Sequence, residues 1–332
     1  MKKIIIYCFL FSHTLLIGGQ DIRTIIIDAQ EARPINLSEI FENVTPIVLE
    51  KQTSIQNIFF TNEYLFVAAI GSVIQYDLSG KYVRTIDCGG YVTNNIGGDK
   101  DKKEIFVPVG DKIRSYNYSG MMKKEYSLKS SSIYCLYHNS VLWVLLEDFQ
   151  SDSSIIYSIC KVNPVTGQAT ALPFEKKVEP IQLENGSLVS IGTIGGLSLH
   201  NDEVVVSFAF EKALYKIQQD RIIPFVQWDV SPPAGNADVN SLKANGYTGD
   251  HLFINYRRDD QFYIYIENIK TGKTYNVSNL IDDVFHTNRA CNIRFMHQGY
   301  YYFIKERSDI KGNSIGNIPL KNGPVIFIVK SK

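Results

Sequence analysis

Hydrophobic residues in this chain come in short runs separated by polar turns, and almost nowhere at helical spacing. Such runs of Val, Ile, Tyr and Phe predict β-strands, because β-branched and aromatic side chains pack well on a pleated surface. The segment Leu37 to Asn43 is the one place that invites a short helix. Six strongly apolar runs recur, at Tyr64–Ala69, Ile105–Val109, Val141–Leu146, Val204–Phe208, Leu252–Tyr256 and Tyr300–Ile304.

A second strand type follows these runs and ends in a turn in which Asn or Asp precedes Gly. Glycine suits the end of such a turn because it tolerates positive φ. The turns occur at Asp77 to Gly80, Asn117 to Gly120, Asn163 to Gly167 and Asn268 to Gly272. The repeating unit is therefore about as long as one four-stranded antiparallel sheet, the blade of a β-propeller.

Six such units account for the chain, at residues 53–87, 91–127, 131–175, 190–229, 238–278 and 290–330. Four-stranded repeats cannot bury both faces alone, so they stack radially. We predict an all-β protein, a six-bladed β-propeller of four-stranded antiparallel blades that forms one domain over residues 21–332. The last unit lacks an outer strand, and we expect the N-terminal segment Val44 to Glu50 to supply it and close the ring. Ile22 to Asp28 is expected to add to that edge or to pack against it.

The first twenty residues are typical of a secretory signal peptide. Lys2 and Lys3 precede a mostly apolar stretch, and small or polar residues, Gly18 to Gln20, follow it. The stretch is shorter than the ~20 residues that span a bilayer, and no later segment is apolar for long enough, so no transmembrane segment is expected. Cys8 lies too early in the stretch for lipid attachment. We expect an exported protein of the periplasm or cell surface.

Charge and cysteine content narrow the function classes. The chain has 34 basic and 34 acidic side chains, which disfavours a nucleic-acid-binding protein driven by bulk charge. The four cysteines beyond the signal lack CxxC spacing and have no histidine at ligand spacing, which argues against a zinc site. They are Cys88, Cys135, Cys160 and Cys291. We expect buried free thiols, although an exported protein could also pair them.

Three segments near the start carry a resemblance to a known family. They are Ile47 to Glu50, Ile55 to Phe60, and Val73 to Val83. Together they resemble the opening of the exported six-bladed β-propeller proteins common in Bacteroidota, which are similar in shape to NHL-repeat propellers. Family members often carry a Gly-rich segment with Pro and Glu after the first blade, and Asp87 to Asn95 here lacks both. The resemblance therefore implies fold and export, and no reaction.

No catalytic set stands out. There is no G-x-S-x-G elbow, and the histidines are scattered without HExxH spacing. Propeller lactonases resemble this chain in shape and hold calcium on inner-strand Glu, Asn and Asp side chains. The inner-strand candidates here are Asn57, Asn94, Asn95, Asn240, Asn292 and a single carboxylate, Asp238. Hard cations prefer carboxylates, so we expect no metal and no cofactor. A metal-dependent hydrolase, lactonase or lyase acting on a sugar derivative at the central channel stays as the alternative.

Arginine and aromatic residues supply the candidate ligand-binding set. Arginine forks suit carboxylates and sugar hydroxyls, and aromatic rings stack on sugars. The set comprises Arg257, Arg258 and Asp259 after the apolar strand of the fifth unit, Arg289 and Arg294 around the start of the sixth, and Trp228 and Tyr247 near the loops that join the fourth and fifth. The leading hypothesis is a non-enzymatic binding module that holds an unknown peptide, protein or glycan on one face of the propeller.

Overall fold

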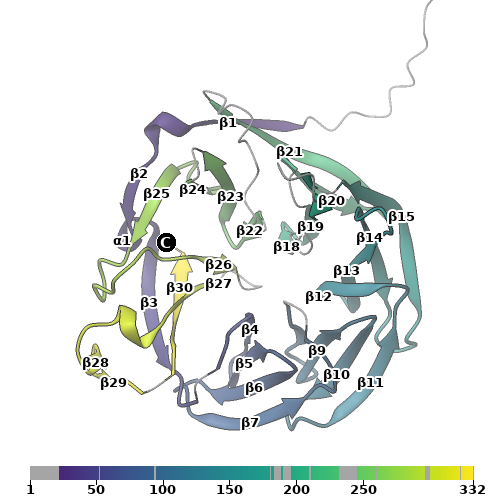
Figure 1. The fold of residues 1–332 in the computed structure, drawn as a ribbon, viewed down its shortest axis with the longest axis horizontal. Coiled ribbons are helices and arrows are strands. Elements are labelled where there is room, and N and C mark those ends of the chain that lie inside the picture. Colours follow the sequence, from purple (N-terminus) through teal and green to yellow (C-terminus); the bar gives the residue numbers. More distant parts are fainter. Residues whose placement is uncertain are drawn as a thin grey trace, which may run out of the picture.

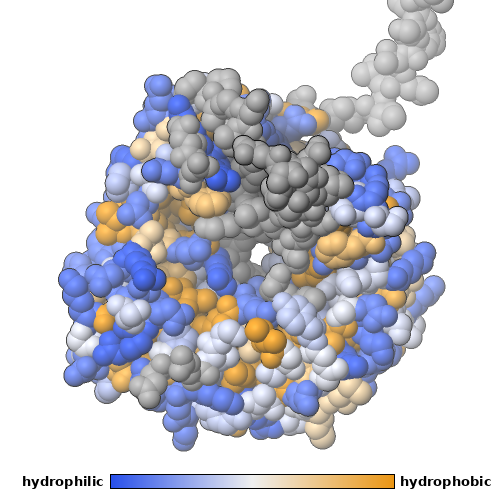
Figure 2. Space-filling model, viewed as in Figure 1, coloured by the Kyte–Doolittle hydropathy of each residue, from blue (hydrophilic) through white to orange (hydrophobic). Residues whose placement is uncertain are grey.

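The computed structural model is a six-bladed β-propeller, and each blade is built from antiparallel strands around a central axis (Figure 1). It describes residues 22–331 except 52, 93–94, 180, 183–187, 190–195, 209–210, 232–244, 259–260, 296–299 and 322. The predicted signal peptide lies outside the described residues. The same view in space-filling form has a narrow opening near the centre of the ring, and hydrophilic residues prevail along the outer circumference (Figure 2).

The first three blades are four-stranded, and their strands follow chain order. Blade one contains β4 (Asn57–Phe60), β5 (Tyr64–Ala69), β6 (Ser72–Asp77) and β7 (Tyr82–Asp87). Blade two contains β8 (Gly97–Asp99), β9 (Glu104–Val109), β10 (Lys112–Asn117) and β11 (Met122–Ser127). Blade three contains β12 (Ser131–His138), β13 (Val141–Phe149), β14 (Ile155–Val162) and β15 (Ala169–Val178).

The remaining blades repeat this meander. Blade four contains β18 (Gly196–His200), β19 (Glu203–Ser207), β20 (Ala213–Gln218) and β21 (Arg221–Ser231). Blade five contains β22 (Gly246–Thr248), β23 (His251–Arg258), β24 (Gln261–Asn268) and β25 (Thr274–Ile281). Blade six contains β26 (Arg294–Phe295), β27 (Tyr300–Lys305) and β30 (Val325–Ser331). Short additions are β16 (Ile181–Gln182) paired with β17 (Leu188–Val189), the 3-10 helix η2 (Arg307–Asp309), and β28 (Ser314–Ile315) paired with β29 (Ile318–Pro319).

The six apolar runs of the sequence form the second strand of each blade, next to the innermost one. These strands are the most completely buried, because neighbouring blades cover both of their faces; all six residues of β9, for example, are buried. The sequence prediction of six blades is confirmed.

The N-terminal segment 23–48, here called the belt, adds an outermost strand to three successive blades (Figure 1). The parallel strands β1 (Arg23–Asp28) and β2 (Arg33–Asn36) pair with β21 and β25. The antiparallel strand β3 (Phe41–Val48) pairs with β30 and becomes the fourth strand of blade six. The 3-10 helix η1 (Ala29–Glu31) and the helix α1 (Leu37–Ile40) connect these strands.

The belt confirms one prediction and corrects two. Closure of the last blade by the segment around Val44 is confirmed. The placement of residues 22–28 at that same edge is wrong, because Ile25 and Ile27 bury their side chains against blade four instead. The helix predicted from Leu37 ends at Ile40, since Phe41 already begins the closing strand.

Edge chemistry explains where the belt lies. The part of β21 that pairs with β1 carries Val226, Trp228 and Val230, which pack with Ile25 and Ile27 of the belt and would otherwise form an apolar edge. In the described chain the outer strands of blades one to three have no further partner, and each carries basic residues. These are Arg84 in β7, Lys123 and Lys124 in β11, and Lys176 and Lys177 in β15. Charges on an open edge discourage pairing with other chains.

The four described cysteines are buried and unpaired, as free thiols should be in a packed core. Burial raises the pKa of the Cys88 thiol to about 11 and that of Cys135, Cys160 and Cys291 to about 12. Such thiols stay protonated and unreactive at neutral pH. Among the described residues, no helix is both long and apolar enough to cross a membrane.

Candidate functional site

A groove of about 410 Å³ lies between blades four and five. Its lining combines aromatic rings, aliphatic side chains and two cations, contributed by the belt and by both blades. The described residues that line it are Arg23, His200, Lys216, Phe225, Val226, Tyr247 and Ile269. We call it the inter-blade groove.

Three stacked rings form the floor of the inter-blade groove. His200 and Tyr247 stack with ring centroids 3.9 Å apart and an interplanar angle of 23°. The ring of Phe225 lies 6.2 Å from that of His200 and 5.9 Å from that of Tyr247, stacked on both. The backbone N–H of Tyr247 donates to Ser198 Oγ at 3.3 Å, which ties β22 to β18 beneath the rings.

Two cations border the rings. Arg23 Nη2 donates to Glu267 Oε1 and Oε2 at 2.6 and 2.7 Å. Lys216 Nζ lies 5.9 Å from the centroid of Phe225 and 3.7 Å from Glu203 Oε2. The two carboxylates lie behind the cations and do not line the groove. The charged groups that face the groove are therefore hydrogen-bond donors.

The titratable rings of the floor are neutral at pH 7. Burial lowers the pKa of His200, and the nearby Lys216 acts in the same direction, while Glu203 opposes the shift. Burial raises the pKa of Tyr247 to about 12. A neutral imidazole can donate through one ring nitrogen and accept through the other.

Strand direction places the groove on one face of the propeller. Turns of an antiparallel meander alternate between its two ends. His200 ends β18 at the first turn of blade four, and Ile269 follows β24 at the third turn of blade five. Both lie at the end opposite to Arg257 and Arg258, which end the second strand of blade five.

The predicted arginines are not brought together by the fold. Arg257 and Arg258 are half-buried, and the guanidinium of Arg257 lies 5.7 Å from the ring centroid of Phe262. Arg289 Nε pairs with Asp309 Oδ1 at 3.1 Å on blade six. Arg294 lines a separate pocket. Asp259 lies outside the described residues.

The two predicted aromatic residues have different surroundings. Tyr247, in β22, lies on the floor of the inter-blade groove. Trp228 lies inside β21 and is only 2% exposed, packed in the core that also holds Ile25 and Ile27 of the belt. Because the belt covers its ring, Trp228 is not accessible to a ligand.

Sequence reasoning missed Arg23, His200, Lys216 and Phe225. No local motif marks these residues, because they come from three strands of blade four and from the belt. One signal could have helped to find them: β20 and β21 form a hairpin, and its register brings Lys216 near Phe225.

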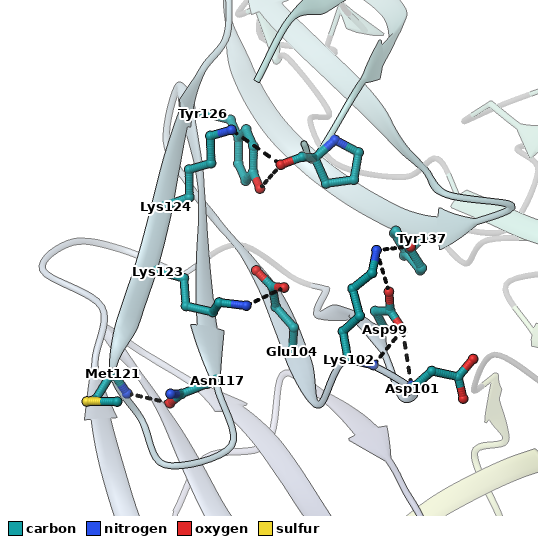
Figure 3. A network of polar contacts seen from close by, with 11 residues as sticks. Asp99, Asp101, Lys102, Glu104, Asn117, Met121, Lys123, Lys124, Tyr126 and Tyr137 are labelled. Atoms are coloured by element: carbon teal, nitrogen blue, oxygen red, sulfur yellow. Dashed lines mark hydrogen bonds and ion pairs between the residues drawn. The ribbon is translucent and has the colours of Figure 1, made fainter. Parts of the chain in front are cut away.

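A network of polar contacts lies on blade two and reaches Tyr137 of blade three (Figure 3). Asp99 and Glu104 are buried and face each other across β8 and β9. Lys102 Nζ lies 3.3 Å from Asp99 Oδ2, and Lys123 Nζ lies 3.2 Å from Glu104 Oε2. Burial opposes ionisation of Asp99, yet hydrogen bonds from Tyr137 and Lys102 outweigh it and lower its pKa. Each carboxylate is thus compensated by a lysine, and the network stabilises the turn between β8 and β9.

Metal ligation has no support among the described residues, where no three His, Cys, Asp or Glu side chains gather closely enough to hold an ion. Of the calcium candidates, Asn57 is partly buried, Asn95 is 1% exposed and Asn292 is exposed. Asn94, Asp238 and Asn240 lie outside the described residues.

Comparison with known proteins supports the fold but assigns no function. No protein-family model and no curated protein matches the chain. A protein of Bacteroides fragilis, named as a candidate exported protein, has a TM-score of 0.63 at 14% identity, over 93% of this chain and 99% of that one. A protein of unknown function from Bacteroides thetaiotaomicron has a TM-score of 0.52 at 12% identity, over 94% and 75% of the two chains. Hydrazine synthase of Kuenenia stuttgartiensis has a TM-score of 0.50 at 11% identity, over 77% and 74%.

Proposed function

We propose that this protein is an exported, non-enzymatic binding module that holds an acidic peptide segment with one apolar side chain in the inter-blade groove. The observation that carries the proposal is the described lining, which has apolar side chains and rings on the floor and whose charged groups are all hydrogen-bond donors. The ligand must therefore bring an apolar group together with acceptors, and carboxylates are the strongest acceptors for Arg and Lys.

A peptide fits this lining better than a sugar does. Sugar stacking needs an exposed aromatic face, whereas Tyr247 is 3% exposed and its ring is covered by His200. One face of Phe225 is approached by Lys216. What remains is a half-buried apolar surface with Ile269 at its margin, which suits an aliphatic or aromatic side chain. Burying such a side chain contributes about 1.5–3 kcal/mol.

Export to the periplasm or cell surface is part of the proposal. It is supported by the signal-like pattern of residues 1–20 and by the name of the Bacteroides fragilis protein of similar fold. A rigid propeller of this kind needs no cofactor to present a groove.

The test is a binding screen with peptides that carry one Leu or Phe between Asp or Glu residues, against matched basic peptides and uronic-acid oligosaccharides. We expect acidic peptides to bind, and Lys216→Gln to weaken binding about tenfold, the effect of one partly buried charged hydrogen bond. Lys311→Gln, at an exposed lysine on blade six, is the control and should change nothing. Preference for the oligosaccharides, or equal affinity in the Lys216 and Lys311 variants, would overturn the proposal.

The alternative, a metal-dependent hydrolase at the central channel, differs in a simple observable. Such an enzyme should copurify with a divalent cation on elemental analysis and lose it with chelators. A binding module should retain its peptide affinity after chelation.

A further inference from the structure

A second hollow, of about 200 Å³, lies where blade six meets blade one at the seam of the ring. It shares no residue with the inter-blade groove and lies on the opposite face, because β27 ends there as the second strand of its blade. The described residues that line it are Ile55, Asn292, Arg294, Ile304 and Glu306. We call it the seam pocket.

Arg294 supplies a fixed positive charge. Its Nη1 donates to the carbonyl oxygens of Ile55 and Gln56 at 3.3 and 3.1 Å, which holds the guanidinium against blade one. Among the described residues, no carboxylate pairs with it. Two carbonyls orient the group without neutralising it, so the charge is available to a ligand.

Glu306 supplies the opposite charge. Its side chain is exposed, and its backbone N–H donates to Asp309 Oδ2 at 3.2 Å, which fixes the residue at the start of η2. Within the described part of the chain, Glu306 has no cationic partner. The seam pocket therefore holds one cation and one anion that do not pair with each other.

Lys305 makes the pocket rigid. This side chain is 1% exposed, and its Nζ donates to the carbonyls of Asn288, Arg289 and Ala290 at 2.8, 2.6 and 3.1 Å. The three bonds fasten the segment that leads to Asn292 onto β27, which carries Ile304. Both walls are thus set before any ligand arrives, a condition for tight binding of a small molecule.

We infer that the seam pocket binds a free aliphatic amino acid as a zwitterion. The carboxylate would pair with Arg294, the ammonium with Glu306, and the aliphatic part would contact Ile55 and Ile304. A ligand with one charge would leave the other pocket charge without compensation. A hollow of about 200 Å³ suits a single amino acid and is too small for a folded segment.

The test is calorimetric titration with L-leucine, N-acetyl-leucine and leucinamide at millimolar concentrations. We expect L-leucine to bind, and the two singly charged analogues to bind at least about tenfold more weakly, since each loses one charged hydrogen bond. Arg294→Gln and Glu306→Gln should each weaken L-leucine binding by a similar factor. Arg221→Gln, at an exposed arginine of blade four that lines neither hollow, is the matched control.

Circular dichroism of each variant separates loss of binding from loss of fold. Absence of heat with L-leucine on the folded wild-type protein would overturn the inference. So would equal affinity for N-acetyl-leucine, or equal affinity in the Arg294 and Arg221 variants.

Discussion

Gly80 shows how a single backbone conformation supports ring closure. It has φ +82°, and a Cβ atom there would collide with the carbonyl oxygen of Val48 at the end of the belt. The carbonyl oxygen of Gly80 also accepts the N–H of Glu50 at 2.9 Å. The turn after β6 thus packs on the belt so closely that only glycine fits.

Gly80→Ala should lower the free energy of unfolding by more than Gly272→Ala does. Both glycines have positive φ, which costs about 1–2 kcal/mol for a residue with a Cβ. Gly272 has open space where its Cβ would stand, so only Gly80 adds a collision. Urea unfolding of the two variants measures the difference, and equal destabilisation would show that the contact with Val48 is loose.

His251 is a residue whose burial makes stability depend on pH. It is 1% exposed among the rings of Phe41, Phe253 and Tyr301. Burial lowers its pKa from 6.5, against a smaller opposing effect of Asp250. The unfolded chain therefore binds a proton more readily than the folded one, and stability falls as the pH drops below about 6.5 towards the lowered folded value.

Replacing His251 with Phe should reduce this loss of stability. The measurement is the free energy of unfolding in urea at about pH 7 and pH 5, which bracket the ordinary histidine pKa. His200 contributes with the same sign and remains in the variant, so the pH dependence should shrink without vanishing. An unchanged difference between the two pH values would contradict the role of His251.

At the scale of elements, the belt is the feature that local sequence could not place. The apolar runs that became β5 or β9 were predictable because burial between blades demands continuous apolar residues. The partner of β1 was not, because Arg23 to Asp28 pairs with residues about two hundred positions away, and parallel pairing leaves no local signature. The lining of the groove shows the same limit: Tyr247 could be named as a candidate because it lies near a loop, whereas Arg23 reaches the groove only through the belt.

The belt should hold to blade four through its inward-facing isoleucines. Ile27 is 1% exposed and its neighbour Ile26 is 63% exposed. Ile27→Ala should lower the free energy of unfolding by about 2–5 kcal/mol, the usual cost of emptying a buried isoleucine site. Ile26→Ala is the adjacent control and should stay within about 0.5 kcal/mol of wild type. Comparable effects in the two variants would mean that β1 does not pack as described.

At the scale of the whole molecule, the propeller separates two hollows. The inter-blade groove and the seam pocket lie at different blade junctions and on opposite faces, each with its own charges. A rigid ring can therefore hold a ligand in one hollow without distorting the other. Both proposed binding events depend on which face of the propeller the ligand contacts.

Hydrogen exchange with and without a bound acidic peptide tests that point most directly. We expect slower exchange of backbone amides in β18, β20, β21 and β22, around the inter-blade groove, and unchanged exchange at the far end of β23 and in residues 306–321. Protection confined to those far segments, with none around His200 and Tyr247, would show that the peptide does not bind in the inter-blade groove.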